Sequence, residues 1–67
     1  MDSVYKVIEI IGTSERSWEE AARTAVEKAS QSLKDLRVAE VKELDIRLED
    51  GKLFYRTKLN VSFKYLD

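Results

Sequence analysis

Residues 48–65 read LEDGKLFYRTKLNVSFKY, which contains the strongest strand pattern of the chain. From Leu53 onward two sets of side chains alternate over thirteen residues, one mostly apolar and the other mostly polar. Alternation with period two over such a length is typical of a β-strand with one buried face. At about 3.3 Å per residue the strand spans roughly 40 Å, about twice the usual length, so its far end needs a cover.

Residues 36–49, LRVAEVKELDIRLE, form the predicted partner of this strand. The Asp50-Gly51 pair between the two strands is typical of a two-residue hairpin loop. Such a loop places Leu48 opposite Leu53. The same register gives the pairs Ile46–Tyr55, Leu44–Thr57, Asp45–Arg56 and Glu43–Lys58. Apolar pairing on one face and charge pairing on the other therefore support one register.

The apolar side chains of this second strand change phase between Val41 and Leu44. A β-bulge near Lys42 and Glu43 restores the phase, because it adds one residue to the strand. Beyond the bulge the expected pairs are Val41–Leu59 and Ala39–Val61. The residues that the bulge moves to the polar face are Val38 and Glu40. An apolar side chain on that face, which points away from the helix, calls for a partner or a ligand.

Two further elements precede the hairpin. Residues 3–11, SVYKVIEII, predict a strand that ends in a turn at residues 12–14, and apolar side chains on both of its faces predict burial on both. Ser17 and Glu20 form a capping box at the start of an amphipathic helix of about 17 residues, whose apolar stripe is mostly alanine. Trp18 opens this stripe, so we expect it to pack in the core.

These elements predict an α+β fold in which a three-stranded antiparallel sheet, in the order strand, helix, strand, strand, wraps around one helix. A helix of roughly 25 Å leaves about 15 Å of the long strands uncovered. Exposed apolar sheet of that extent is an association surface, and closed symmetric assembly is the usual way to cover it.

Composition narrows the class of protein. The chain of 67 residues predicts a single domain over 1–67, and it has no Cys for a disulfide or thiolate zinc site and no His. Twelve basic against thirteen acidic residues argue against nucleic acid and membrane surfaces as partners. Without a transmembrane run or a signal peptide in the sequence, the expected location is the cytoplasm.

The sequence does not predict a set of catalytic residues. Ser14 and Ser17 read as turn and cap residues rather than nucleophiles, since no His is present to act as their base. The carboxylates of Glu43 and Asp45 are close enough in sequence for acid–base work, but the hairpin register gives each a basic partner. We expect a protein that is not an enzyme.

The segments VYKVIEIIGTSERSWEEAARTAVEKA (residues 4–29) and LRVAEVKELDIRLEDGKLFYRTKLNVSFKY (residues 36–65) resemble the dodecin family over nearly the whole chain. The opening VYKVIE, GTS and SWE, the AEV of the second strand and the closing VSFK carry the resemblance. It implies a homododecamer, a hollow shell with cubic symmetry that binds flavin or another small ligand. It also implies that neighbouring protomers cover the overhanging strands.

The same resemblance implies that flavin-binding members place a stacking Trp at the position of Val38 and a hydrogen-bonding Gln at the position of Arg56. Both determinants are replaced here, and a guanidinium only donates, so flavin affinity is expected to fall by about tenfold to a hundredfold. Arg56 has two interpretations, a cross-strand ion pair or a contact with an anionic ligand. The candidate ligand-binding residues are Val38, Asp45, Arg47 and Arg56.

The Val-Ala pair after Leu-Arg resembles the branch of calcium dodecins. The metal candidates are Glu40 and Glu43, with Asp45 and Glu49 as further carboxylates; each is otherwise a solvated or paired strand charge. Because calcium takes six to eight oxygen ligands, symmetry-related copies have to complete any site. Three functions remain open: a shell that binds calcium, another divalent cation or a small polar ligand; weakened binding of FMN or riboflavin; and a purely structural or protein-interaction assembly.

Overall fold

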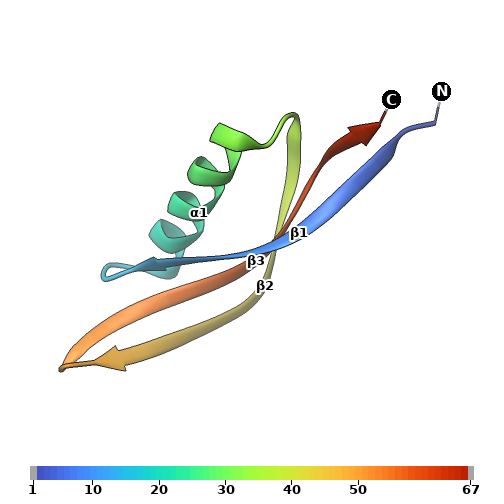
Figure 1. Cartoon of the computed structure of the whole chain (residues 1–67). Coiled ribbons are helices and arrows are strands. Elements are labelled where there is room, and N and C mark those ends of the chain that lie inside the picture. The colour runs from blue at the N-terminus through green and yellow to red at the C-terminus, as the bar shows by residue number, and fades with distance from the viewer. Residues whose placement is uncertain (1, 67) are drawn as a thin grey trace.

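The computed structural model describes residues 2–66 and shows one helix lying on one face of a three-stranded sheet (Figure 1). The elements in chain order are β1 (Val4–Ser14), α1 (Trp18–Ser32), β2 (Leu36–Glu49) and β3 (Lys52–Leu66). The strand order is β1-β3-β2 with both pairs antiparallel, so the long third strand is the centre of the sheet. The predicted α+β fold is confirmed.

The hairpin between β2 and β3 has the predicted loop and register. Asp50 and Gly51 both have positive φ, 51° and 77°, as the two central residues of a type I′ turn require. Leu48 pairs with Leu53 and Asp45 pairs with Arg56. The other predicted pairs, on both sides of the bulge, are also present: Ile46–Tyr55, Leu44–Thr57, Glu43–Lys58, Val41–Leu59 and Ala39–Val61.

The bulge predicted in β2 lies between Val41 and Glu43. It brings Val38 opposite Ser62 and thereby onto the face that carries Arg56. Two other irregularities, one in β2 between Leu36 and Val38 and one in β1 between Val4 and Tyr5, were not predicted by the pattern of apolar residues.

Strand β1 is longer than predicted, because the expected turn at residues 12–14 continues the strand. Gly12 pairs with Thr57 of β3. A Cβ atom on Gly12 would fall on the backbone carbonyl of Ala21, so the glycine lets the helix approach the strand closely. Glycine therefore serves packing at this position rather than a change of chain direction.

Helix α1 begins with the predicted cap at Ser17, whose Oγ accepts a hydrogen bond of 3.0 Å from the amide of Glu20. The second half of the capping box differs from the prediction. The amide of Ser17 donates to Oγ of Ser14 at 3.5 Å, and the Glu20 carboxylate lies 3.9 Å from Arg23. Since Ser14 replaces the glutamate as acceptor, the end of β1 and the helix cap form one unit.

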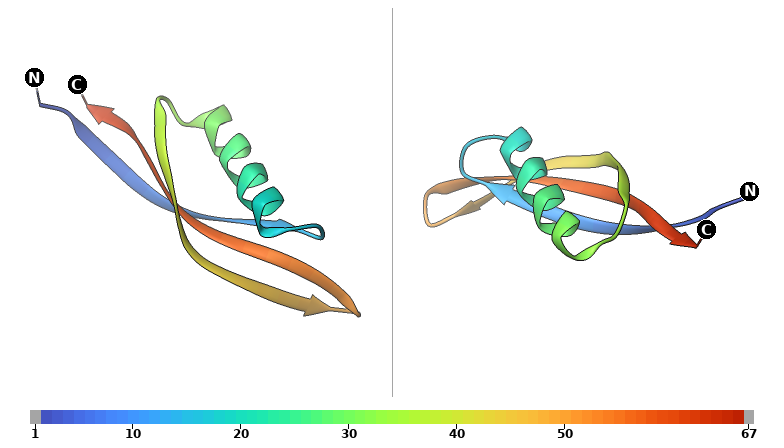
Figure 2. Two further views of the ribbon diagram at one scale, coloured as in Figure 1. Left: turned by 180° about the vertical axis from the view of Figure 1, so that it is seen from behind. Right: turned by 90° about the horizontal axis from the view of Figure 1, so that it is seen from above.

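The helix covers only part of the sheet. Its 15 residues span about 22 Å, whereas the molecule is 52 Å long. Figure 1 shows that the β2–β3 hairpin and the strand ends near the termini both extend beyond α1, and Figure 2 shows all strands on one side of it. Among the residues that the structure describes, the buried hydrophobic ones are Ala21, Ala25, Leu59 and Val61. No helix within residues 2–66 has the length and apolar character needed to span a bilayer.

Burial of β1 on both faces, which the sequence predicted, does not occur within one protomer. Tyr5, Val7 and Ile11 point away from α1 and are 48%, 56% and 48% exposed. The reason is that no second layer lies on that side of the sheet (Figure 2). Only Ile8 and Ile10, on the other side, pack against the core.

Candidate functional site

The face of the sheet opposite α1, here called the helix-distal face, brings together all predicted site residues. Core residues Leu59 and Val61 point to the helix, so the residues that alternate with them along β3 point to the helix-distal face. Its members on β2 are Val38, Glu40, Glu43, Asp45, Arg47 and Glu49.

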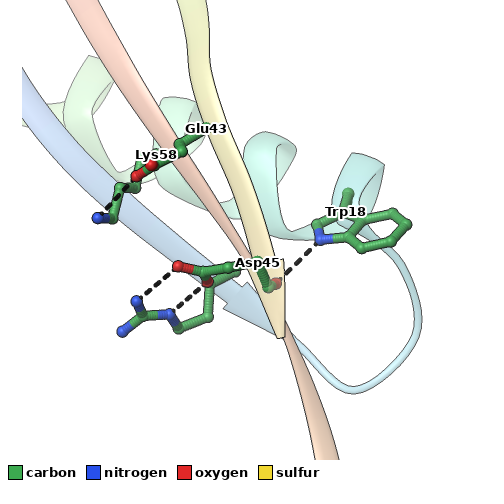
Figure 3. A network of polar contacts seen from close by, with 5 residues as sticks. Trp18, Glu43, Asp45 and Lys58 are labelled. Atoms are coloured by element: carbon green, nitrogen blue, oxygen red, sulfur yellow. Dashed lines mark hydrogen bonds and ion pairs between the residues drawn. The ribbon is translucent and has the colours of Figure 1, made fainter. Parts of the chain in front are cut away.

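Arg56 and Asp45 form a two-pronged ion pair on this face. The guanidinium Nε donates to Oδ1 of Asp45 at 2.7 Å, and Nη2 donates to Oδ2 at 2.8 Å (Figure 3). These hydrogen bonds, more than the charge attraction that accompanies them, lower the pKa of Asp45 and raise that of Arg56. The interpretation of Arg56 as a cross-strand ion pair is thereby confirmed, and its remaining N–H groups stay available for an anionic ligand.

A second ion pair lies directly beside the first. Lys58 Nζ is 2.9 Å from Oε1 of Glu43, and its hydrogen bond to this carboxylate raises the pKa of Lys58 (Figure 3). The two acidic side chains of β2 therefore face the two basic side chains of β3, and opposite charges pair across the strands. Glu43, one of the two metal candidates, has a cation as neighbour, which competes with a metal ion for its oxygens.

Arg47, the last ligand-binding candidate, is engaged near the hairpin end. Its Nη2 donates to Oε1 of Glu49 at 2.8 Å, and its guanidinium carbon lies 5.6 Å from the ring centroid of Phe54. More than half of both the Arg47 and Glu49 side chains is exposed. This exposed pair is weakly held, so a ligand can displace it at small cost.

Trp18 joins the helix start to the back of the charged region, a role that the sequence did not predict. Its indole Nε1 donates to the backbone carbonyl of Asp45 at 3.0 Å (Figure 3). Its ring meets Tyr55 edge-on with centroids 5.0 Å apart, and its own carbonyl accepts from Oγ1 of Thr57 at 2.9 Å. The ring is half-buried and packs on Tyr55 beside the core cluster rather than within it, so the predicted core position is met only in part. The indole also supports the strand segment that carries Asp45.

Val38 and Glu40 occupy the part of the helix-distal face beyond the bulge. Val38 is 58% exposed and lies across Ser62 from Val7 on β1. Glu40 likewise lies across Asn60 from Glu9, another residue of β1. These two rows place an apolar pair next to a carboxylate pair.

The sequence pattern does not single out Glu9 as a candidate, whereas the pairing of β1 with β3 places it in the row of Glu40. Neither Glu9 nor Glu40 forms an ion pair with any residue in the range 2–66. In the same range, no three Asp, Glu, His or Cys side chains converge closely enough to hold a metal ion. One protomer thus offers a pair of free carboxylates and an amide, which is less than a complete cation site.

Comparison with known proteins gives consistent results at the level of sequence and of structure. The profile of the Dodecin family matches residues 4–66. Calcium dodecin of Mycobacterium tuberculosis is 59% identical over 63 residues, which make up 92% of this chain and 89% of that protein.

Two solved structures show the same architecture. A crystal structure of the M. tuberculosis calcium dodecin, described as a calcium-chelating antigen with a novel calcium-binding site, superposes with a TM-score of 0.88 at 58% identity. The aligned part covers 94% of this chain and 91% of that one. A dodecin from Streptomyces davaonensis superposes with a TM-score of 0.90 at 31% identity and covers 100% of both chains.

Proposed function

The chain belongs to the dodecin family, and from this premise we propose that it forms a hollow homododecamer that binds calcium or another divalent cation. The observation that carries the proposal is the 59% identity to a calcium dodecin. Val38 and Arg56 also support a ligand other than flavin, because they occupy the positions where flavin-binding members are expected to have Trp and Gln.

Assembly is supported by the apolar surface that one protomer leaves open. In the described part of the chain eleven large hydrophobic side chains are between 47% and 70% exposed, whereas two of the four buried hydrophobic residues are alanines. A core of this size is small for a stable chain of 67 residues. Other copies of the same chain are therefore the simplest way to bury the exposed apolar surface.

Cation binding is supported by the carboxylates of the helix-distal face. Glu40 is the strongest of the predicted metal ligands, because Glu43 and Asp45 are already paired with Lys58 and Arg56. Glu9 and the amide oxygen of Asn60, in the same row, are further hard oxygen donors of the kind calcium prefers. Since one protomer cannot supply six to eight such ligands, the site is completed by symmetry-related copies.

The protein is proposed to be a non-catalytic binding or storage shell. The two carboxylates that offered acid–base chemistry, Glu43 and Asp45, each hold a cation instead. The location in the cytoplasm and the absence of nucleic-acid and membrane partners, expected from composition, belong to this proposal.

Calorimetric titration of the purified shell with calcium tests whether the protein binds the cation. We expect saturable binding that weakens at least about tenfold in Glu40→Gln, since the variant removes one anionic ligand per protomer. Glu27→Gln, which removes an equal charge from the exposed side of α1, serves as the control. If calcium binds equally tightly to Glu40→Gln, the assignment of Glu40 as a ligand is wrong. If calcium does not bind to the wild type, the proposal that the shell binds calcium is wrong.

Weakened flavin binding is the second candidate, and the row formed by Val7, Ser62 and Val38 favours it. Two exposed aliphatic side chains across one serine give a ring system contact area without a stacking partner. Quenching of riboflavin fluorescence at low micromolar protein distinguishes this candidate from the cation. A shell that responds to neither ligand leaves the purely structural or protein-interaction assembly.

A further inference from the structure

Two apolar surfaces lie on opposite flanks of α1 in the same protomer. The first, here called the hairpin strip, comprises Val41, Leu44, Ile46, Leu48 and Leu53. Its residues are on the helix-facing side of the sheet, yet they are 47% to 70% exposed because α1 lies over β1 and β3. The most exposed member, Leu48, pairs across the hairpin with Leu53 and forms a projecting apolar tip.

The second surface is a groove of about 400 Å³ between β1 and the C-terminal half of α1, here called the α1–β1 groove. Its apolar lining includes Ile8, Ile10, Ala25, Ala29 and Leu33, and Lys28 is its charged member. Because β1 is an edge strand, the groove is bounded on that side by no further strand of the protomer.

We infer that the hairpin tip of one copy docks into the α1–β1 groove of a second copy. The groove follows α1 from Thr24 to Ser32, about 12 Å along the helix axis, which accommodates the side chains of Leu48 and Leu53. The charges are complementary, because Asp50 lies in the turn beside the tip and Lys28 lies in the groove. Neither residue forms an ion pair with any other residue between 2 and 66.

The occupant must come from another copy, since the helix itself separates tip and groove within one protomer. The contact joins two different surfaces, so it is heterologous, and such a contact forms a closed ring where the rotation between successive copies closes. This inference rests on the proposed dodecamer, whose cubic symmetry requires heterologous contacts around threefold axes. The inference identifies the parts of the chain that form these heterologous contacts.

Disulfide cross-linking tests the contact directly, because the chain contains no cysteine of its own. We expect Leu48→Cys combined with Ala29→Cys to give linked dimers and trimers on a non-reducing gel after mild oxidation of the assembled protein. Each single variant, and Leu48→Cys combined with Val7→Cys on the helix-distal face, serves as a control. An assembled double variant that cross-links no more than these controls overturns the inference.

Mass measurement of two charged variants provides a second test. Leu48→Asp is expected to lower the particle mass from about twelve chains to two or fewer, whereas Lys52→Asp, on the other face of the hairpin, leaves it unchanged. Ala29→Arg is expected to block the groove in the same way. An equimolar mixture of Leu48→Asp and Ala29→Arg is expected to gain one contact per pair of chains but not the full particle mass, because the intact tip of Ala29→Arg fits the intact groove of Leu48→Asp whereas the reverse contact has lost both halves.

This experiment distinguishes failure of the hairpin–groove contact from failure of the proposed dodecamer. If wild type assembles and Leu48→Asp assembles equally well, the hairpin contact is wrong and the dodecamer stands. If wild type is itself a folded monomer, both are wrong. Circular dichroism of each variant distinguishes loss of contact from loss of fold.

Discussion

The guanidinium of Arg56 holds both carboxylate oxygens of Asp45 across neighbouring strands, at 2.7 and 2.8 Å. The pair lies on the same face of the sheet as Val38, beyond the second ion pair of Glu43 and Lys58. A ligand approaching this face therefore meets a closed pair of charges and an aliphatic side chain, where the family resemblance leads one to expect an amide and an indole. This difference in chemistry is the physical basis for doubting tight flavin stacking.

Restoring the flavin determinants should restore flavin affinity. We expect Val38→Trp with Arg56→Gln to bind riboflavin at least about tenfold more tightly than wild type, measured by fluorescence quenching. The double variant leaves the Asp45 carboxylate without its partner, so adding Asp45→Asn should increase the gain further. Val41→Trp, which places the indole on the helix-facing side, is the control; an equal gain there, or no gain in the double variant, contradicts the position of the pocket.

The Asp45–Arg56 pair should make stability fall in acid. The pKa of Asp45 is below its ordinary value of 3.8, chiefly because Arg56 donates hydrogen bonds to it. Its contribution is therefore present above about pH 3.8 and is lost as pH falls through the lowered pKa of the folded state. The urea midpoint at fixed protein concentration should drop less between pH 6 and pH 2.5 in Asp45→Asn than in wild type, and equal drops would contradict this linkage.

The Glu43–Lys58 pair should make the stability of the fold decrease in base. The pKa of Lys58 is raised above 10.5, first of all by its hydrogen bond to Glu43, so the contribution is complete below about pH 10.5 and is lost as pH rises through the raised value. Lys58→Gln should reduce the loss of stability between pH 9 and pH 11.5. A loss as large as that of wild type would show that the pair does not contribute.

Gly12→Ala should destabilise the fold, although the substitution adds a single methyl group. The new Cβ would fall on the carbonyl of Ala21, so strand and helix must separate, at a cost of about 1–3 kcal/mol. Thermal unfolding followed by circular dichroism measures the effect, with Thr13→Ala as the neighbouring control. Unchanged stability would mean that α1 does not approach β1 as closely as described.

Trp18→Phe should cost about 1 kcal/mol of unfolding free energy. Phenylalanine keeps an aromatic ring beside Tyr55 but cannot donate to the carbonyl of Asp45. Tyr65→Phe, which removes a polar group from an exposed ring, is the control in urea denaturation. A variant as stable as wild type would show that water replaces the indole N–H without loss.

The hairpin was predictable because several local signals agree on it. The Asp50-Gly51 turn, the Leu48–Leu53 pair and the Asp45–Arg56 pair all require the same register, and the phase change before Leu44 locates the bulge. Each of these signals acts between residues that are close along the chain, where sequence patterns are most informative.

The features that sequence did not predict depend on contacts between distant parts of the chain. Gly12 resembles a turn residue until the position of Ala21 is known, and the indole of Trp18 finds the Asp45 carbonyl only once α1 lies beside β2. Glu9 joins the row of Glu40 only through the pairing of β1 with β3. The roles of the candidate residues in binding, and the single domain over 1–67, stay predictions.

Native mass spectrometry of the wild-type chain at low micromolar concentration measures how many copies assemble. We expect a particle of about twelve times the 7.8 kDa chain, because the protomer exposes more apolar sheet than its helix covers. A folded monomer of 7.8 kDa under these conditions would contradict it, together with every site that depends on more than one copy.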